Sequence, residues 1–434
     1  MNRKILALAI PNIVTNITIP LLGMVDIGLM GHMGSAVYLG AIAIGTMIFN
    51  IIFWGFSFLR MGTSGFTAQA YGSRNLNESV LILCRSLLVG LAGSIALILL
   101  QYPIAWIAFK LVNSTTEVES LARQYFYIRI YAAPATLCIY SLTGWFIGMQ
   151  NAKSPMILAI SVNILNIIFS LIFIKIAHMN SDGIALANVC SQCIGLLFGL
   201  FLIRPYFRKL KKYLIFKDIF NVGALRHFLN VNKDIFIRTL CLIFTFSFFT
   251  TQSANTSDTI LAVNTLLFQF LFFFSYFADG FAYAAEALTG RYIGSGDLKM
   301  LKRVIHRLFT FGTLIAVVFT IIYLLAGRTI LGLLTNNEQL IASTQPYVFW
   351  IVLLPLISFA AFIWDGIYIG ATASKAMRNS MLIITFGIFL PVYFAVKQSM
   401  GNHGLWLAML LFMGSRGVFL TFMAGRTIFG YKLL

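Results

Sequence analysis

The stretch GFTAQAYGSRNL (65–76) recurs 222 residues later as ALTGRYIGSGDL (287–298). Identical residues at this shift include Thr67 and Thr289, Gly72 and Gly294, Ser73 and Ser295, Leu76 and Leu298, Arg85 and Arg307, and Gly90 and Gly312. Small residues and leucine are common, so each match alone is weak. The constant spacing is the strong observation, because self-similarity at a fixed shift indicates a duplicated unit. The chain is therefore predicted to contain two related halves.

The repeat extends to two glycine-containing motifs. The shift of 222 takes GWFIG (144–148) onto GIYIG (366–370), and a shift of 221 takes GIALA (183–187) onto GLWLA (404–408). A GxxxG motif lets two helices approach closely. We expect these glycines to pack helices, and we hypothesise that they join the two halves.

The composition places both halves in a membrane. Apolar residues make up 59% of the 434, charged residues 10%, and the mean hydropathy is +0.89. A soluble globule needs a more polar exterior, and a spanning helix needs about 20 mostly apolar residues. Twelve spans are predicted, at roughly 5–31, 37–68, 83–102, 120–149, 155–176, 183–203, 234–252, 260–290, 305–326, 343–371, 380–396 and 403–425. The fold class is an all-α membrane protein of about twelve helices.

The distribution of basic residues predicts the topology. Both termini and the even-numbered links hold 22 of the 31 Lys and Arg residues, whereas the odd-numbered links hold four. Lys and Arg concentrate in cytoplasmic links, so we expect both termini and the even-numbered links in the cytoplasm. The net charge of +18 then indicates anionic lipid as a partner, and not nucleic acid.

Six spans per half make the halves parallel repeats. We predict a six-helix lobe at 1–203, a basic cytoplasmic linker at 204–233 and a second lobe at 234–434. The linker alternates charges with Tyr, Leu, Ile and Phe, which fits either a helix on the membrane surface or a plain solvated connector. Two-lobed transporters alternate access around a site near the midplane. Without a nucleotide-binding motif, the energy for pumping is expected from an ion gradient.

Ionisable residues within spans are functional candidates, because burying a charge in a bilayer is unfavourable. Asp26 lies in the first span, and no basic residue follows Lys4 on that helix. A structural carboxylate is one interpretation of Asp26, but we favour a role in transport. Asn163 and Asn166 recur at helical spacing in the fifth span, where they either join helices or contact a ligand.

The second half contains the other candidates. Asp365 and Glu286 either act in transport or pair with Arg238 or Arg291 for packing, and both alternatives stay open. Asp279 precedes a glycine, a pair that often marks a helix irregularity, so Asp279 is the weakest candidate.

Several segments resemble the multidrug and toxin extrusion (MATE) family, specifically its DinF-like branch. These segments are PLLGMVDIGLMGHMG (20–34), FLRMGTSGFTAQAYG (58–72), NILNIIFS (163–170), GIALAN (183–188), GFAYAAEALTGRYIG (280–294), WDGIYIGATAS (364–374) and MRNSM (377–381). Together they sample both halves in order. The resemblance implies a two-lobed exporter in the bacterial inner membrane that exchanges cations for amphipathic, often cationic, organic compounds.

The resemblance also implies roles for individual residues. The acid of the family's first helix falls on Asp26, the proline that bends this helix on Pro11, and the asparagine that partners the acid on Asn166. Two further positions of the first lobe depart from the branch, since Ser170 stands where an aspartate is common and Asn188 where threonine is common.

In the second lobe the resemblance matches Arg238 to a basic residue that opens the seventh helix. Asp365 matches an acid of the tenth helix, while the seventh-helix acid of other branches has no counterpart.

We therefore expect a cation-coupled antiporter, not an enzyme, without cofactor or bound metal. Asp26 is the only carboxylate expected at the first-lobe site, and a strong sodium site usually has several anionic or carbonyl ligands. Coupling to protons is favoured, with sodium as the alternative. A flippase for lipid-linked sugars is the rival within transport, and a non-transporting membrane scaffold or receptor is the rival of another class.

Overall fold

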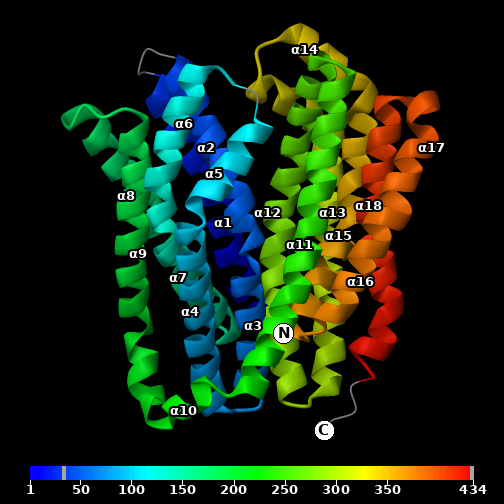
Figure 1. Ribbon diagram of the computed structural model, residues 1–434. Helices are drawn as coiled ribbons and strands as arrows, with labels where there is room; N and C mark the ends of the chain where they lie inside the picture. The colour runs from blue at the N-terminus through cyan, green and yellow to red at the C-terminus, as the bar shows by residue number, and fades with distance from the viewer. Residues whose placement is uncertain (32–35, 113, 431–434) are drawn as a thin grey trace. The chain divides into compact units, whose positions relative to one another are not determined.

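The computed structural model describes residues 1–31, 36–112 and 114–430, and every regular element in these ranges is a helix (Figure 1). For nine of the described residues only the backbone is given: 19, 22, 24, 26, 27, 29–31 and 36. The side chain of Asp26 is among these, so the main predicted site residue lies outside the described side chains.

The helices of the first half precede a short linker. In chain order they are α1 (Asn2–Gly31), α2 (Ala36–Gly55), α3 (Phe58–Gly72), α4 (Leu76–Leu99), α5 (Gln101–Leu111), α6 (Thr116–Arg129), α7 (Ala133–Gly148), α8 (Lys153–Leu171) and α9 (Ser181–Leu210). The one-turn helix α10 (Phe216–Ile219) follows.

The second half repeats this order. Its helices are α11 (Val222–Thr256), α12 (Asp258–Gly294), α13 (Leu298–Leu334), α14 (Glu338–Thr344), α15 (Val348–Gly370), α16 (Ser374–Ile384), α17 (Leu390–Met400) and α18 (Asn402–Thr427). A π-helical segment, Thr385–Phe389, joins α16 to α17 into one span.

The predicted membrane class is confirmed. Eleven helical stretches between Val37 and Thr427 are long and apolar enough to span a bilayer, and α1 is a further helix of 30 residues. These twelve match the predicted spans one to one. Several are longer than predicted, because their polar ends continue as helix beyond the apolar part that hydropathy detects.

Two of the helices that are longer than predicted, α4 and α13, begin at side-chain caps that occur at matching positions of the repeat. Asn75 accepts a hydrogen bond from the Glu78 amide at 3.0 Å, and α4 therefore begins at residue 76 and not at 83. Its counterpart 222 residues later, Asp297, accepts from the Met300 amide at 2.9 Å at the start of α13.

The chain forms two compact units whose limits differ from the predicted lobes. One unit is Val14–Leu229, and the other combines Met1–Ile13 with Asn230–Leu434. The limits cut through α1 and α11. The start of α1 belongs with the second half because it packs on α12, where a Cβ at Gly280 would lie 3.0 Å from the Ala9 carbonyl oxygen. We call the two units the first and the second lobe below.

Each GxxxG motif packs two helices of one lobe. A Cβ at Gly148 on α7 would lie 2.8 Å from the Ser64 carbonyl oxygen on α3, and one at Gly370 on α15 would meet the Glu286 carbonyl oxygen on α12. Residues 64 and 286 are themselves 222 apart, so the contact is duplicated with the sequence. The hypothesis that these glycines join the two halves is wrong, because their nearest neighbours belong to the second span of their own half.

Candidate functional site

A cluster of neutral polar groups lies between α8 and α9 of the first lobe. Asn166 donates from Nδ2 to Ser191 Oγ at 3.4 Å and accepts from Ser170 Oγ at 3.5 Å. All three side chains are buried. Ser191 Oγ donates in turn to the Asn188 carbonyl oxygen at 3.0 Å, so Asn188 contributes its backbone to the cluster. The structure therefore brings together three of the predicted site residues and adds Ser191.

Ser191 was absent from the sequence prediction. A serine in a helix often bonds to a carbonyl three or four residues earlier, and Ser191 does this with Asn188. The three-residue spacing of Asn188 and Ser191 could therefore have predicted this hydrogen bond. Serines are common in membrane helices, however, and the spacing does not predict the contact with Asn166.

A hydrogen bond sets the register between α1 and α8. Asn163 Nδ2 donates to the Thr18 carbonyl oxygen at 3.4 Å. As the first and fifth spans, α1 and α8 run in the same direction, and both end at the upper edge of Figure 1. Asp26 lies eight residues, about 12 Å, beyond Thr18, and Ser170 lies seven residues, about 10 Å, beyond Asn163. The backbone of Asp26 is therefore nearly level with Ser170, about one helical turn beyond Asn166.

Pro11 lies just before the point where α1 passes from one compact unit to the other. It is buried, and α1 is helical on both sides of it. The unit boundary follows Ile13, two residues later. A proline removes one backbone hydrogen bond from a helix interior, so Pro11 weakens this turn of α1.

The second lobe contains a buried charge triad that joins three helices. Asp365 on α15 accepts through Oδ2 from Arg238 on α11, and at 2.5 Å from Arg416 Nη2 on α18. Their exposed fractions are 7%, 5% and 3%. Asp365 therefore pairs with Arg238, as one of its two predicted alternatives has it. Protonating Asp365 would remove the carboxylate that both buried guanidinium groups share, which is unfavourable.

Arg416 was missed by the sequence prediction. It lies within the predicted last span, where a basic residue is itself unusual and was a usable signal. Arg416 Nη1 also donates to Met413 Sδ at 3.2 Å, and its guanidinium lies over the ring of Phe412 at 5.7 Å. These contacts hold it in an apolar part of the lobe.

A second, partly buried ion pair lies between α11 and α16. Arg378 Nη1 donates to Asp234 Oδ1 at 2.6 Å, and Ser374 Oγ donates to Asp234 Oδ2 at 3.0 Å. Asp234 is 7% exposed. Asp234 on α11 and Asp365 on α15 are thus each paired with arginine.

The two acidic candidates of α12 differ from each other in burial. Glu286 is 1% exposed, and Asp279 is half-buried. The irregularity expected at Asp279 is not observed, because α12 continues as helix from Asp258 to Gly294. The interruption lies instead at the matching place in the first lobe, between the end of α2 at Gly55 and the start of α3 at Phe58.

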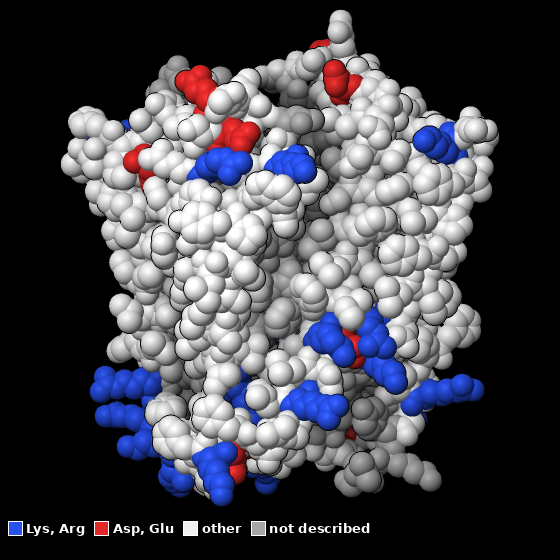
Figure 2. All heavy atoms as spheres, viewed as in Figure 1, with Lys and Arg blue, Asp and Glu red and all other residues white. Residues whose placement is uncertain are grey.

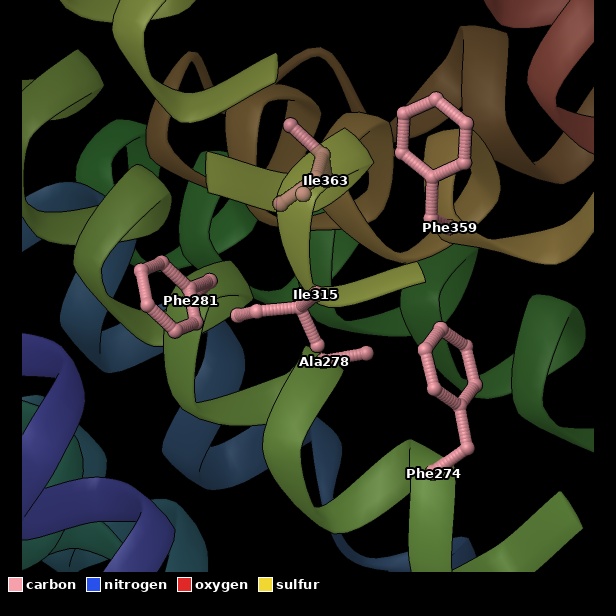
Figure 3. Close-up of a pocket in the computed structure, with 7 residues that line it drawn as sticks. Phe274, Ala278, Phe281, Ile315, Phe359 and Ile363 are labelled. Atoms are coloured by element: carbon pink, nitrogen blue, oxygen red, sulfur yellow. The ribbon is translucent and has the colours of Figure 1, made fainter. Parts of the chain in front are cut away.

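A small apolar pocket lies in the second lobe between α12, α13 and α15 (Figure 3). Its lining residues are Phe274, Ala278, Phe281, Gly312, Ile315, Phe359 and Ile363. Its volume of about 10 Å³ is close to the space of one water molecule. Sites for drug-sized ligands have volumes of about 300–1,000 Å³, so this pocket is a packing gap.

Comparison with known proteins identifies the family. The MatE family model matches the chain twice, at residues 11–172 and 235–396. DNA damage-inducible protein F of Escherichia coli (strain K12) is 38% identical over 95% of this chain and 89% of its own length. Multidrug and toxin extrusion protein 1 of Oryctolagus cuniculus is 24% identical over 97% of this chain and 74% of its own length.

A solved structure shows the same fold. The crystal structure of MATE in the bent conformation superimposes with a TM-score of 0.86 at 16% identity, covering 99% of this chain and 96% of that one. The repeated match of the family model coincides with the duplicated helix order and the duplicated glycine contacts. This multi-pass membrane protein belongs to the MatE family of transporters.

Proposed function

We propose that the protein is a proton-coupled antiporter that expels amphipathic, mainly cationic organic compounds, with Asp26 as the coupling carboxylate. The observation that carries this proposal is the hydrogen bond from Asn163 to Thr18, because it aligns α1 with α8 so that the backbone of Asp26 is nearly level with Ser170, about one turn beyond Asn166. The relative named multidrug and toxin extrusion protein 1 supports the substrate class.

Two buried carboxylates of the second lobe, Asp365 and Asp234, are poorer coupling groups than Asp26. A coupling group has to change its charge during the cycle, as a general acid does. Asp365 and Asp234 are each paired with arginine, so a proton on either would remove the negative charge that stabilises the pair. The groups described around Asn166 are neutral, so a proton binding to Asp26 leaves no cation unpaired among them.

Protons fit this first-lobe cluster better than sodium does. Its described side-chain ligands are the amide of Asn166 and the hydroxyls of Ser170 and Ser191. A strong sodium site usually adds a second carboxylate or a ring of carbonyls. With one carboxylate, the cluster is suited to exchange a proton on one side and an organic cation on the other. Such a cycle uses no cofactor and no bound metal ion.

The arginines of the second lobe argue against the flippase alternative. A lipid-linked sugar carries a pyrophosphate, whose binding requires uncompensated cations. Arg238 and Arg416 instead share one oxygen of Asp365. The proposal places the protein in the inner membrane with both termini in the cytoplasm. In this orientation the links rich in Lys and Arg face the cytoplasm, as basic links of membrane proteins usually do.

The test is dye efflux in everted membrane vesicles with proton and sodium gradients imposed separately. Wild type should respond to the proton gradient, and Asp26→Asn should lose at least tenfold of that flux. Asp182→Asn is the matched control, because Asp182 is a first-lobe carboxylate at the start of α9 whose bond to the Asn180 amide an asparagine can replace.

Three outcomes would contradict the proposal. Flux driven by sodium at equal pH, and indifferent to the proton gradient, would assign the wrong ion. Full activity of Asp26→Asn would remove Asp26 from coupling. No efflux of any dye by wild type, with unaltered Asp26→Asn stability, would favour the scaffold or receptor alternative.

A further inference from the structure

The linker segment of the first lobe, residues 204–220, presents a basic and apolar outer surface. We define the linker surface by six exposed basic residues and three exposed apolar residues at the end of α9 and along α10. The basic residues are Arg204, Arg208, Lys209, Lys211, Lys212 and Lys217, and the apolar residues are Ile215, Phe216 and Phe220. Basic side chains gather at this end of the helices in Figure 2.

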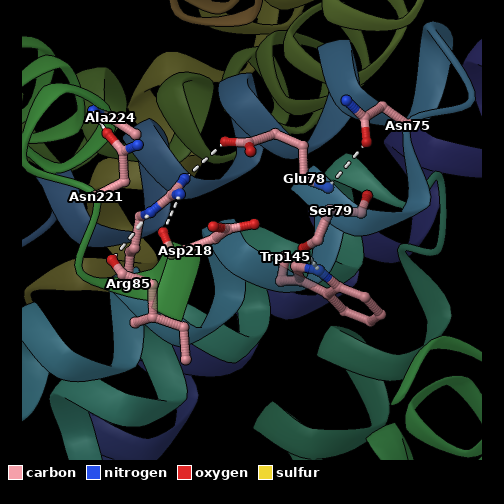
Figure 4. Close-up of polar contacts among 9 residues, drawn as sticks. Asn75, Glu78, Ser79, Arg85, Trp145, Asp218, Asn221 and Ala224 are labelled. Atoms are coloured by element: carbon pink, nitrogen blue, oxygen red, sulfur yellow. Dashed lines mark hydrogen bonds and ion pairs between the residues drawn. The ribbon is translucent and has the colours of Figure 1, made fainter. Parts of the chain in front are cut away.

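The inner side of the same segment is fixed to the first lobe. Arg85 on α4 is 4% exposed and donates to Glu78 Oε1 at 2.7 Å, to the Asp218 carbonyl oxygen at 2.8 Å and to the Ile219 carbonyl oxygen at 3.4 Å (Figure 4). Arg85 thereby caps the C-terminal carbonyls of α10, where a cation is favourable.

Side chains of α9 extend this attachment toward the membrane. Tyr206 Oη accepts from Asn151 Nδ2 at 2.9 Å, and its ring packs edge-on against Trp145 at 5.5 Å. Leu210 is buried in the same cluster. Since α10 is held by its carbonyls and α9 by these side chains, the outward face of the linker is fixed in the structure.

That outward face has the composition of a membrane-interface element. Phe216 is 72% exposed, Phe220 65% and Ile215 55%. The spanning helix α9 that precedes them also carries exposed apolar side chains, such as Leu197 at 66% and Phe201 at 63%. Amphipathic helices with aromatic and basic side chains lie in the headgroup region, where the apolar groups reach the acyl boundary.

We propose that the linker surface binds anionic phospholipids of the adjoining leaflet. Phosphate groups contact the Lys and Arg side chains, and Phe216 and Phe220 insert among the upper acyl carbons. The first lobe is in this way fixed to the leaflet through the linker. Each basic side chain near an anionic surface raises affinity about fivefold, so three of them distinguish anionic from zwitterionic lipid clearly.

A second basic segment shows why charge alone is insufficient. Residues 291–310 of the second lobe, all described, carry Arg291, Lys299, Lys302, Arg303 and Arg307. None of the large apolar side chains in this segment is exposed. Arg307, the repeat counterpart of Arg85, is exposed. This segment is a solvated charged face, and it supplies the control for the experiment.

The experiment measures lipids retained by the purified full-length protein in native mass spectrometry, titrated with phosphatidylglycerol or phosphatidylcholine. Wild type should retain phosphatidylglycerol at least tenfold more tightly than phosphatidylcholine. The triple variant Lys211→Gln, Lys212→Gln and Lys217→Gln should lose that preference. The matched control, Lys299→Gln, Lys302→Gln and Arg303→Gln, removes the same charge and should change retention less than twofold.

A second pair of substitutions tests the apolar groups. Phe216→Ser with Phe220→Ser should weaken retention of both lipids by a similar factor and keep the preference for the anionic headgroup. Thermal unfolding of each variant verifies that it is folded. Equal retention of the two lipids by wild type, or equal losses in the linker and control triples, would overturn the proposal. The readout is independent of transport, so it stands or fails separately from the proposed function.

Discussion

The two lobes share their backbone packing and differ in their buried polar groups. In both, a GxxxG motif lies against the carbonyls of the second span of the same half. The first lobe adds neutral groups, such as the Asn166 cluster, whereas the second adds the ion-paired triad around Asp365. Duplication thus preserved the helix contacts, and the polar groups diverged on that common frame.

The matching positions show how far the divergence goes. Asp365 stands where the first lobe has Thr143. In the first lobe Ser86 connects the hydroxyls of Thr63 and Ser141, at 2.5 Å and 2.8 Å. The three counterparts of these hydroxyl residues in the second lobe are apolar: Ala285, Leu308 and Ile363. The described hydrogen bonds at these positions are therefore neutral in the first lobe, whereas Asp365 in the second lobe is paired with two arginines.

The largest effect is expected from Asp365→Asn, which removes the carboxylate that Arg238 and Arg416 share. Breaking a buried ion pair costs about 3–5 kcal/mol, and thermal unfolding in detergent should show a loss of this size. Thr143→Val, at the matching position of the first lobe, should cost about 1 kcal/mol or less.

A variant that removes the whole triad provides the complementary test. Arg238→Met, Asp365→Leu and Arg416→Met together replace every charge with an apolar group, and stability should return close to that of wild type. If this triple variant is as unstable as Asp365→Asn, packing and not uncompensated charge explains the single substitution.

The second largest loss of stability is expected from substitutions in the glycine packing that both lobes share. Gly148→Leu and Gly370→Leu should each destabilise by about 1–3 kcal/mol or abolish folding, because each places a side chain on a neighbouring backbone. Folded yield and thermal unfolding are the measurements. Gly332→Leu is the control, since Gly332 is exposed and no atom lies within 4 Å of its added Cβ. A large effect in only one lobe would contradict the duplicated contact.

The sequence predicted the repeat and the spans because both depend on local, periodic features. The shift of 222 appears again in the cap pair Asn75 and Asp297. The partners of buried charges were less predictable, because they depend on which helices lie side by side. Arg416 and Asp234 were missed for this reason, and Arg238 was paired with Asp365 only as one of two alternatives. The boundaries of the two compact units, which fall within α1 and α11, likewise depend on tertiary packing, and hydropathy does not report tertiary packing.

A third prediction compares the two matching arginines. Arg85→Met removes three hydrogen bonds from a buried guanidinium, including one to a carboxylate, and should cost about 1–2 kcal/mol. Arg307→Met, on an exposed face, should change the unfolding free energy by less than about 0.5 kcal/mol. Thermal unfolding of both variants makes the comparison, and equal losses would mean that linker attachment does not depend on Arg85.

The smallest effect is expected from the hydroxyl chain of the first lobe. Ser86 Oγ and Ser141 Oγ are 2.8 Å apart, and Ser141 Oγ also donates to the Leu137 carbonyl oxygen at 3.2 Å. Hydrogen bonds between membrane helices contribute about 0.6 kcal/mol on average, because other partners are found in the unfolded state. A double-mutant cycle of Ser86→Ala and Ser141→Ala, measured by thermal unfolding, should therefore give a coupling energy of about 0.6 kcal/mol. A coupling above about 2 kcal/mol would mean that the hydroxyls hold the first lobe as firmly as charges hold the second. A small value explains instead why these serines could become Leu308 and Ile363 in the other lobe without loss of the shared backbone packing.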